Sequence, residues 1–256
     1  MRLVVLGSGT CIPDPNRLPS GYWLEAGGAY LRMDVGPGTV EATGGLGANW
    51  EHQTHQYVSH FHVDHIGDLA ALLFSFKFGR EQAEREPLTI FGPKGLKAFV
   101  DGLCKLYDLN LLDQSFEVII EEVKPGDAFE ISDDFVATFE KANHTKEALA
   151  IRLDADGYRI GYTGDTAWSD DLVTFFKRCD ILIGECSFLE DTKGTPHLNA
   201  HEIGRLAQQA EVQHLVPTHF FFDPDHHRLI DWIREEYAGK ISIARDGLTL
   251  QHLPRA

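Results

Sequence analysis

The sequence has little positive charge and little cysteine, and each shortage excludes a class of protein. Lysine and arginine number 23 against 39 aspartates and glutamates. The resulting net charge of −16 argues against sequence-independent binding of long duplex nucleic acid, which needs many basic contacts. The 4 cysteines are scattered without a paired spacing, so we expect reduced thiols rather than a disulfide framework.

Long hydrophobic stretches are also missing. No apolar run approaches the roughly 18–20 residues that a membrane span needs. The apolar start over residues 1–7 is too short for a secretory signal, so we expect a cytoplasmic protein without a membrane partner. The chain of 256 residues is 43% hydrophobic and 24% charged and shows no long linker or low-complexity tract. We therefore expect one domain over residues 1–256.

Short β-like runs, separated by glycine and proline, dominate the chain. Gly27-Gly28 separates two such runs, as does Asp156-Gly157, and both dipeptides predict hairpins. A third hairpin is predicted between residues 241–244 and 248–253, across Asp246-Gly247. The other predicted strands cover residues 2–6, 21–25, 29–34, 56–59, 88–91, 116–123, 135–141, 149–153, 158–162, 180–184 and 215–218.

Helices are predicted among these strands in both halves of the chain. Apolar residues follow helical spacing over residues 68–78 and 96–106. A further helix begins after Asn199, a good N-cap residue with Glu202 at the capping-box position. This pattern predicts sheets stacked face to face with helices outside, although an ordinary α/β layer fold fits the same alternation.

The most informative segment is Ser59-His60-Phe61-His62-Val63-Asp64-His65, which follows a short predicted strand. Side chains two apart in extended backbone lie on one side, so His60 and His62 can converge on one ion. Asp64 and His65 lie at a turn into the next helix and can face a second ion. Imidazole nitrogen and carboxylate oxygen suit Zn²⁺ and related ions. The alternative is a histidine-rich surface loop.

Three more residues of ligand type follow apolar strands farther along the chain. His144, Asp165 and His219 each lie just beyond the carboxyl end of a predicted strand. Each alone is more often an ordinary loop residue. Irregular backbone at one edge of a sheet can gather such side chains, so together with the first motif they predict a shared metal site.

In this order, the first motif and the three later residues resemble the metallo-β-lactamase superfamily. The resemblance implies a four-layer αβ/βα sandwich of the α/β (α+β) class, with two divalent metal ions at the edge between the sheets. It implies zinc as the metal, with manganese and iron as alternatives. The ligand set that it implies is His60, His62 and His144 for one ion and Asp64, His65 and His219 for the other, with Asp165 bridging them.

Other segments resemble the RNase Z and phosphodiesterase branch of that superfamily. Gly7-Ser8-Gly9-Thr10 with Pro13 resembles its opening loop, and residues 34–39 resemble its second glycine motif, with Pro37 where RNase Z usually has glutamate. Residues 87–96 resemble its characteristic strand and turn. Glu185 with His197 resembles the late active-site pair of RNase Z.

This resemblance implies roles for three catalytic residues. Asp64 would orient or deprotonate the nucleophilic water as well as touch metal. His197 would donate a proton to the leaving oxygen or stabilise the transition state. Glu185 would hold His197 in the needed tautomer. The alternatives are a loop histidine without a role and, for Glu185, a buried structural hydrogen bond.

The function implied is that of a dinuclear metal-dependent hydrolase, a phosphodiesterase in which a metal-bridging hydroxide attacks phosphorus. Transfer-RNA processing is the best-known activity of the branch. However, residues 65–144 leave no room for the long arm that clamps transfer RNA, and the charge of −16 provides little basic surface. A small-molecule or short phosphodiester is therefore the favoured substrate, and transfer RNA the less favoured one.

Two alternatives remain open. The same metals can serve an ester, lactone, thioester or sulfate-ester hydrolase. A non-enzymatic, metal-stabilised binding protein is the third hypothesis, although a bridging position left for water favours catalysis, because structural zinc sites are closed by protein ligands. Relatives in the branch are often dimers, so a homodimer is expected from the resemblance alone.

Overall fold

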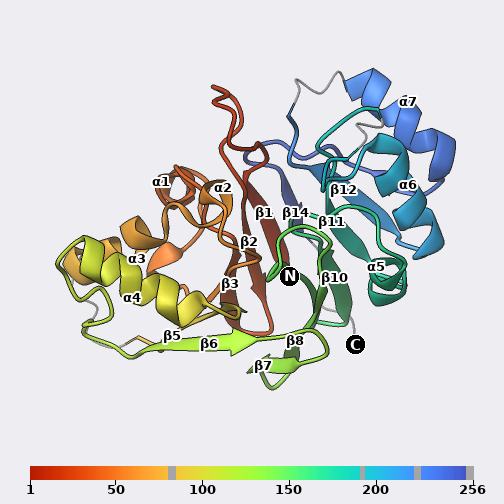
Figure 1. Cartoon of the computed structure of the whole chain (residues 1–256). Helices are drawn as coiled ribbons and strands as arrows, with labels where there is room; N and C mark the ends of the chain where they lie inside the picture. Colours follow the sequence, from red (N-terminus) through yellow and green to blue (C-terminus); the bar gives the residue numbers. More distant parts are fainter. Residues whose placement is uncertain (80–84, 191–193, 222–225, 252–256) are drawn as a thin grey trace.

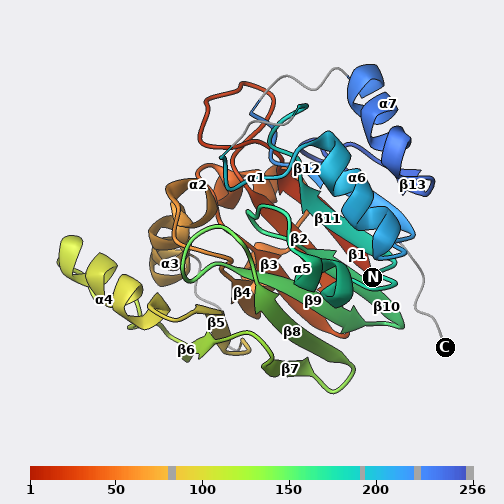
Figure 2. The ribbon, with the colours of Figure 1, turned by 45° about the vertical axis from the view of Figure 1, so that its right-hand side comes forward.

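Two seven-stranded sheets lie face to face in the computed structural model, which describes residues 1–79, 85–190, 194–221 and 226–251 (Figures 1 and 2). The strand order in the first sheet is β14-β1-β2-β3-β4-β5-β6, and in the second it is β13-β12-β11-β10-β9-β8-β7. The strands of the first sheet are β1 (Arg2–Gly7), β2 (Gly21–Ala26), β3 (Ala29–Met33), β4 (His55–Tyr57), β5 (Leu88–Pro93), β6 (Val118–Val123) and β14 (Thr249–Gln251). Those of the second are β7 (Ala128–Ser132), β8 (Phe135–Lys141), β9 (Leu149–Ala155), β10 (Tyr158–Tyr162), β11 (Ile181–Glu185), β12 (His214–Thr218) and β13 (Lys240–Ile241).

Helices cover the outer faces of both sheets (Figure 2). The first sheet carries α1 (Thr39–Gly45), α2 (Val63–Ile66), α3 (Leu69–Phe78) and α4 (Leu96–Leu106), with a 3₁₀ turn at Trp50–His52. The second carries α5 (Asp170–Phe175), α6 (Ala200–Gln209) and α7 (His226–Glu236). The predicted four-layer αβ/βα sandwich is therefore confirmed. The capping box of α6 is confirmed too, since Asn199 and Glu202 exchange side-chain-to-backbone hydrogen bonds of 3.0 Å.

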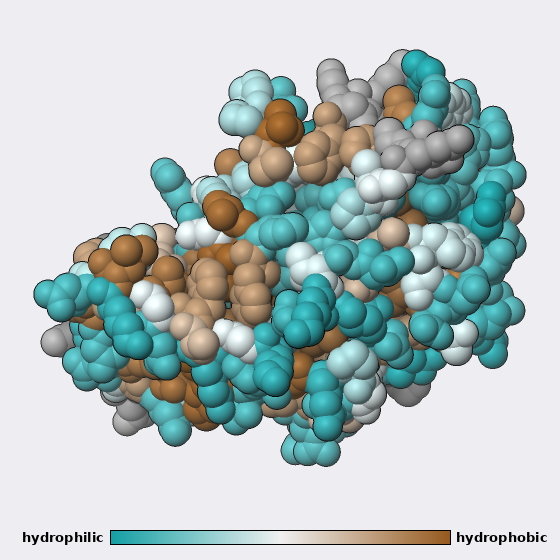
Figure 3. Space-filling view, in the orientation of Figure 1, coloured by the Kyte–Doolittle hydropathy of each residue, from teal (hydrophilic) through white to brown (hydrophobic). Residues whose placement is uncertain are grey.

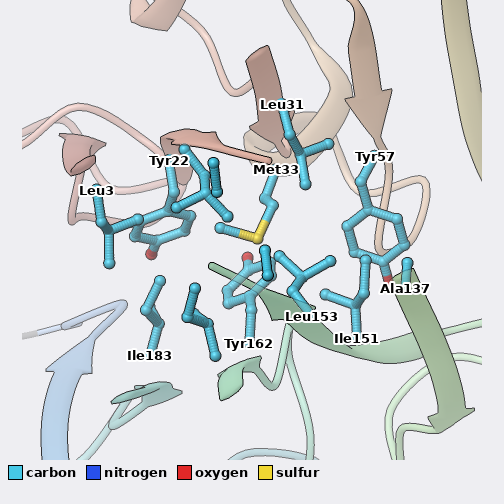
Figure 4. Close-up of a cluster of buried hydrophobic side chains, with 14 of the residues drawn as sticks. Leu3, Tyr22, Leu31, Met33, Tyr57, Ala137, Ile151, Leu153, Tyr162 and Ile183 are labelled. Atoms are coloured by element: carbon cyan, nitrogen blue, oxygen red, sulfur yellow. The ribbon is translucent and has the colours of Figure 1, made fainter. Parts of the chain in front are cut away.

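The main core lies between the sheets. Figure 4 shows its side chains pointing toward one another from both sheets: Leu3, Tyr22, Leu31 and Met33 on one side, and Ala137, Ile151, Leu153, Tyr162 and Ile183 on the other. The strand β8 alternates between buried and less buried residues, whereas β11 and β12 are buried throughout. Continuous burial follows because helices cover the outer face of the parallel part of the second sheet.

The turn residues confirm two hairpins and overturn the third. Gly27-Gly28 and Asp156-Gly157 all have positive φ, as two-residue turns between twisted strands require. The hairpin across Asp246-Gly247 is wrong, because β13 pairs with β12 in the second sheet and β14 pairs with β1 in the first. The chain crosses between the sheets there. Residues 252 and 253 of the predicted last strand lie outside the described residues.

One edge of the sandwich collects the ends of several strands. The strands β10, β11 and β12 run parallel, so their carboxyl ends meet at the same edge of the second sheet. In the first sheet, β4 runs parallel to β3 and β5 and ends two residues before Ser59. Ser59 accepts a backbone hydrogen bond of 3.0 Å from Leu149 on β9, which joins the two sheets at this edge.

Candidate metal centre

The structure brings all the predicted ligands together at this edge in two groups. His60, His62, His144 and Asp165 offer atoms that all lie within 4.8 Å of one another. The same holds for Asp64, His65 and His219. A third grouping, made of Asp165, His197 and His219, also meets this distance.

The local backbone conformation directs several of these side chains toward the candidate metal centre. Extended backbone at His62 ends at the short helix α2, whose first turn carries Asp64 and His65. Asp165 follows Gly164, which has a positive φ of 57° and whose added Cβ would meet Ser59 Cβ at 3.0 Å. His219 itself has a positive φ of 61° just after β12, a strained conformation for a residue other than glycine.

Two histidine pairs approach each other closely. His62 Nδ1 lies 3.1 Å from His144 Nε2, and His65 Nε2 lies 3.3 Å from His219 Nε2. Zinc–nitrogen bonds of about 2.0–2.1 Å in a tetrahedron separate two ligand nitrogens by about 3.3 Å. Both pairs therefore have the spacing of two ligands on one zinc-sized ion.

Asp165 connects the two groups. Its Oδ1 lies 3.2 Å from His65 Nε2 and 3.4 Å from His219 Nε2. Its Oδ2 lies 3.7 Å from His144 Nε2 and 3.8 Å from His60 Nε2. One carboxylate thus presents one oxygen to each group, which is the arrangement of a bridging ligand.

The outer nitrogen of four histidines is held by a neighbour. His65 Nδ1 donates to Asp34 Oδ2 at 2.7 Å, and His144 Nδ1 to the Pro196 carbonyl at 3.1 Å. His60 Nδ1 and His219 Nδ1 lie 3.1 and 3.0 Å from the hydroxyls of Ser59 and Ser187, respectively. Such partners fix the ring and the tautomer, so that Nε2 is the nitrogen available to a metal.

Asp34 is the functional residue that the sequence analysis missed. Its carboxylate is fully buried and accepts hydrogen bonds from Ser59 and from the Tyr162 hydroxyl, besides that from His65. The only signal was its place at the start of the second glycine motif, residues 34–39. A single aspartate before a glycine turn carries no metal-ligand spacing, so its role depends on the fold.

The charge distribution of the centre calls for a cation. Among the described residues, His60 Nε2 and Asp165 Oδ1 are buried and have no hydrogen-bond partner. Burial lowers the pKa of His60 well below its usual range, so this ring is neutral. Burial alone would raise the pKa of Asp165, but the charges of His219 and His65 hold it well below its usual range. Burial alone would lower the pKa of His65, but the carboxylates of Asp165 and Asp34 raise it, so this ring holds a proton that a divalent cation would replace. Neutral imidazole and ionised carboxylate are the forms that bind metal, and the residues present fit a divalent cation.

Glu185 and His197 meet beside the metal ligands. Glu185 is the last residue of β11 and is 1% exposed, and its carboxylate accepts a hydrogen bond from His197 Nδ1 at 3.1 Å. Burial alone would lower the pKa of His197, but the hydrogen bond and charge of Glu185 raise it. His197 Nδ1 lies 3.9 Å from Asp165 Oδ2, so the pair borders the candidate metal centre.

The fold and this centre define a class of protein. A model of the beta-lactamase superfamily domain matches residues 57–220, and the chain belongs to that superfamily. Its His/Asp clusters and its relatives make it a metallo-hydrolase of the superfamily. No helix among the described residues is long and apolar enough to span a membrane.

Particular relatives resemble the chain over nearly its full length. The probable metallo-hydrolase YhfI of Bacillus subtilis is 28% identical over 96% of this chain and 98% of its own. Its crystal structure matches with a TM-score of 0.84 at 25% identity, covering 97% and 98%. Ribonuclease Z of Nitrosopumilus maritimus is 27% identical over 86% of this chain and 89% of its own. The short form of human tRNase Z shares the fold, with a TM-score of 0.80 at 22% identity, covering 98% and 99%.

Proposed function

We propose that this metallo-hydrolase is a phosphodiesterase that works with two divalent cations, most suitably zinc. His60, His62 and His144 would hold one cation, and Asp64, His65 and His219 the other. The observation that carries the proposal is Asp165, whose two oxygens face the two histidine groups separately.

The chemistry of the site divides between the cations and the chain. When bound, two divalent cations lower the pKa of a water ligand and neutralise charge on the attacked phosphoryl group. Asp64, whose Oδ2 lies 3.5 Å from His219 Nε2, would accept a hydrogen bond from that water and so orient or deprotonate it. Burial alone would raise the pKa of Asp64, but the hydrogen bond with His219 and the charges of His65 and His219 keep it below its usual range, so its carboxylate stays ionised and accepts hydrogen bonds.

The leaving oxygen needs a proton in the same reaction, and we assign this role to His197. Glu185 binds His197 at Nδ1, which leaves Nε2 as the atom that donates. The raised pKa of His197 keeps the ring protonated to a higher pH than an ordinary histidine. In this proposal, Glu185 is a positioning residue, and His197 is the general acid.

The relatives named Ribonuclease Z support a phosphodiester as the bond that is cut. The net charge of −16 favours a small or short substrate over transfer RNA. Solvent can reach the candidate ligands at one side, because His62 is exposed while His60 and His65 are buried. This access favours a catalytic role over a purely structural one. A cytoplasmic location and a homodimer stay predictions, and light scattering on the purified protein tests the second.

The decisive experiment is a substrate screen on zinc-reconstituted protein. We expect hydrolysis of bis-p-nitrophenyl phosphate and no comparable turnover of lactones, thioesters or sulfate esters. Asp165→Asn should abolish the activity, whereas Asp113→Asn, at an exposed carboxylate with 75% exposure that pairs with Lys77, should not. Turnover of lactones or thioesters alone would overturn the phosphodiesterase proposal, and a transfer-RNA precursor in the same screen tests the less favoured substrate.

A further inference from the structure

A groove with a volume of about 520 Å³ opens directly beside the candidate metal centre. Its walls are the loop after β1, over residues 10–19, together with Pro37 and the first residues of α2. Asp64 belongs both to the lining of this groove and to the second ligand group. The groove therefore continues from the candidate site, and its volume lies within the range of about 300–1,000 Å³ that is typical of small-molecule sites.

The lining of the groove is predominantly apolar. Ile12, Leu18 and Val63 line it together with four prolines, at positions 13, 15, 19 and 37. Ile12 is 52% exposed and Val63 is 72% exposed, which leaves large apolar side chains in water beside a polar centre. Figure 3 shows apolar surface on the protruding loop above the body of the molecule, where Figure 1 draws the segment after β1. Apolar surface next to a reactive centre indicates a place for an apolar ligand group.

The charges of the groove disfavour an anionic occupant. Among the described residues, Arg17 is the only lysine or arginine in its lining, and its guanidinium donates to Ser8 Oγ at 2.8 Å and to the Ala244 carbonyl at 2.7 Å. Asp14 adds negative charge to the same lining, whereas Asp64 belongs to the candidate ligand set. A second phosphate of a nucleic acid would lie near the Asp14 carboxylate and be repelled by it, whereas an uncharged group would not be.

The loop that forms one wall is anchored at its base. Gly9 donates a backbone hydrogen bond to Leu18 at 2.8 Å, and Leu18 donates to Asp246 Oδ2 at 2.7 Å. The other oxygen of Asp246 accepts from the backbone and hydroxyl of Ser8. The groove is thus built into the fold, which reduces the entropy cost of filling it.

We propose that this groove binds an uncharged apolar ester group of the substrate, so that the preferred phosphodiester carries an alkyl or aryl group beside the scissile bond. The proposal rests on the proposed phosphodiesterase function and adds to it the class of substrate. It assigns Ile12 and Val63 as contacts that determine specificity.

A chain-length series tests it on the zinc-reconstituted enzyme. The substrates are methyl, butyl and octyl p-nitrophenyl phosphates, which share one scissile bond and one leaving group. We expect kcat/KM to rise about threefold for each methylene that enters the groove, or about 30-fold from methyl to butyl. Turnover of the whole series at equal kcat/KM would overturn the groove proposal and leave the phosphodiesterase proposal standing.

Variants at exposed positions locate the effect. Ile12→Asp should reduce the butyl-to-methyl ratio at least tenfold, and Ile12→Leu should restore it. Leu106→Asp is the matched control, because Leu106 is an exposed apolar residue outside the groove, with 76% exposure, and the ratio should not change. A ratio that Ile12→Asp leaves unchanged would contradict the proposal. The exposure of both residues keeps core packing out of the comparison.

A binding measurement separates this proposal from the proposed function. Cys11 is exposed and lines the groove, so its alkylation by N-ethylmaleimide, followed by mass spectrometry, reports occupancy without turnover. We expect octylphosphonate to slow this alkylation and methylphosphonate, at the same concentration, to leave it unchanged. If no phosphodiester is hydrolysed but this protection appears, the phosphodiesterase proposal fails and the groove stands. Equal effects of the two phosphonates would overturn the groove.

Discussion

The two groups of candidate ligands differ in their access to solvent. In the first group, His60 is buried, but His62 is exposed and His144 is half-buried. In the second group, His65 and His219 are no more than 2% exposed, and Asp64 is 9% exposed. The second group is therefore closed in by the protein, while the first opens toward solvent.

The two groups also differ in the residues that hydrogen-bond to their histidines. His65 is held by Asp34, a carboxylate with further hydrogen bonds from Ser59 and Tyr162. His62 has no comparable buried partner among the described residues, and its Nδ1 faces His144 instead. If two cations bind as proposed, we expect the second to be retained more firmly and the first to exchange more readily. The predictions below test this difference.

The largest effect is expected at Asp165, which belongs to the first group and also faces the second. Asp165→Ala should remove both cations and lower kcat more than about a thousandfold, since several kcal/mol of metal-derived stabilisation are lost. Inductively coupled plasma mass spectrometry on the dialysed variant measures the metal content. Retention of both cations by Asp165→Ala would show that the carboxylate does not bridge them.

The contrast between the groups predicts unequal effects of two histidine substitutions. His65→Ala should weaken binding of one cation more than about a hundredfold and lower the melting temperature, because it also removes one of the hydrogen bonds to the buried Asp34 carboxylate. His62→Ala should weaken binding of the other cation and leave the melting temperature of the metal-free protein unchanged. Titration calorimetry and thermal melts measure both effects, and equal losses of stability would contradict the contrast.

Removal of His197, the proposed general acid, should leave the bound metal in place. His197→Ala should lower kcat about a hundredfold for substrates with a poor leaving group, and less for those with p-nitrophenolate, which needs no proton. His201→Ala is the matched control, because this histidine stacks on Trp232 at 5.3 Å and belongs to none of the metal-ligand groups. A uniform loss for all leaving groups would assign His197 a positioning role instead.

The smallest effect concerns His55 on β4, the strand that leads into the first ligand group. Burial lowers its pKa to about 4, against about 6.5 in an unfolded chain. Its contribution to stability is therefore complete above about pH 6.5 and is lost as the pH falls toward about 4. His55 packs between the Phe91 and Phe129 rings, so phenylalanine fits its place. The unfolding free energy of the native protein should fall between about pH 7.5 and pH 5, and in His55→Phe this fall should be smaller by roughly 2 kcal/mol. Denaturant titration of the metal-free protein checks this, and an equal fall in unfolding free energy for the variant and the native protein would contradict it.

The sequence was most informative where chemistry and spacing coincide. His60, His62, Asp64 and His65 are ligand types within one strand-end segment, and the turn dipeptides Gly27-Gly28 and Asp156-Gly157 need a positive φ that few residues adopt. The helix α4 was predicted with both of its ends correct, because its apolar residues follow a clear helical period.

Features that depend on contacts between distant segments were not predictable. Asp34 and Ser187 orient histidines that lie 31 and 32 residues away, and the Pro196 carbonyl does so through backbone alone. The helices α1, α5 and α7 and the strand β7 were missed. At the carboxyl end, Asp246-Gly247 has the local chemistry of a hairpin, but the Asp246 carboxylate binds Ser8 and Leu18 while β14 pairs with β1.

The central claim is that two cations share Asp165 at the edge between the sheets. Anomalous diffraction at the zinc edge, on crystals of the zinc-loaded protein, tests it most directly. The account predicts two peaks about 3.5–4 Å apart on either side of Asp165, one beside His62 and His144 and the other beside His65 and His219. A single peak between Asp165, His197 and His219, or peaks away from these side chains, would contradict it.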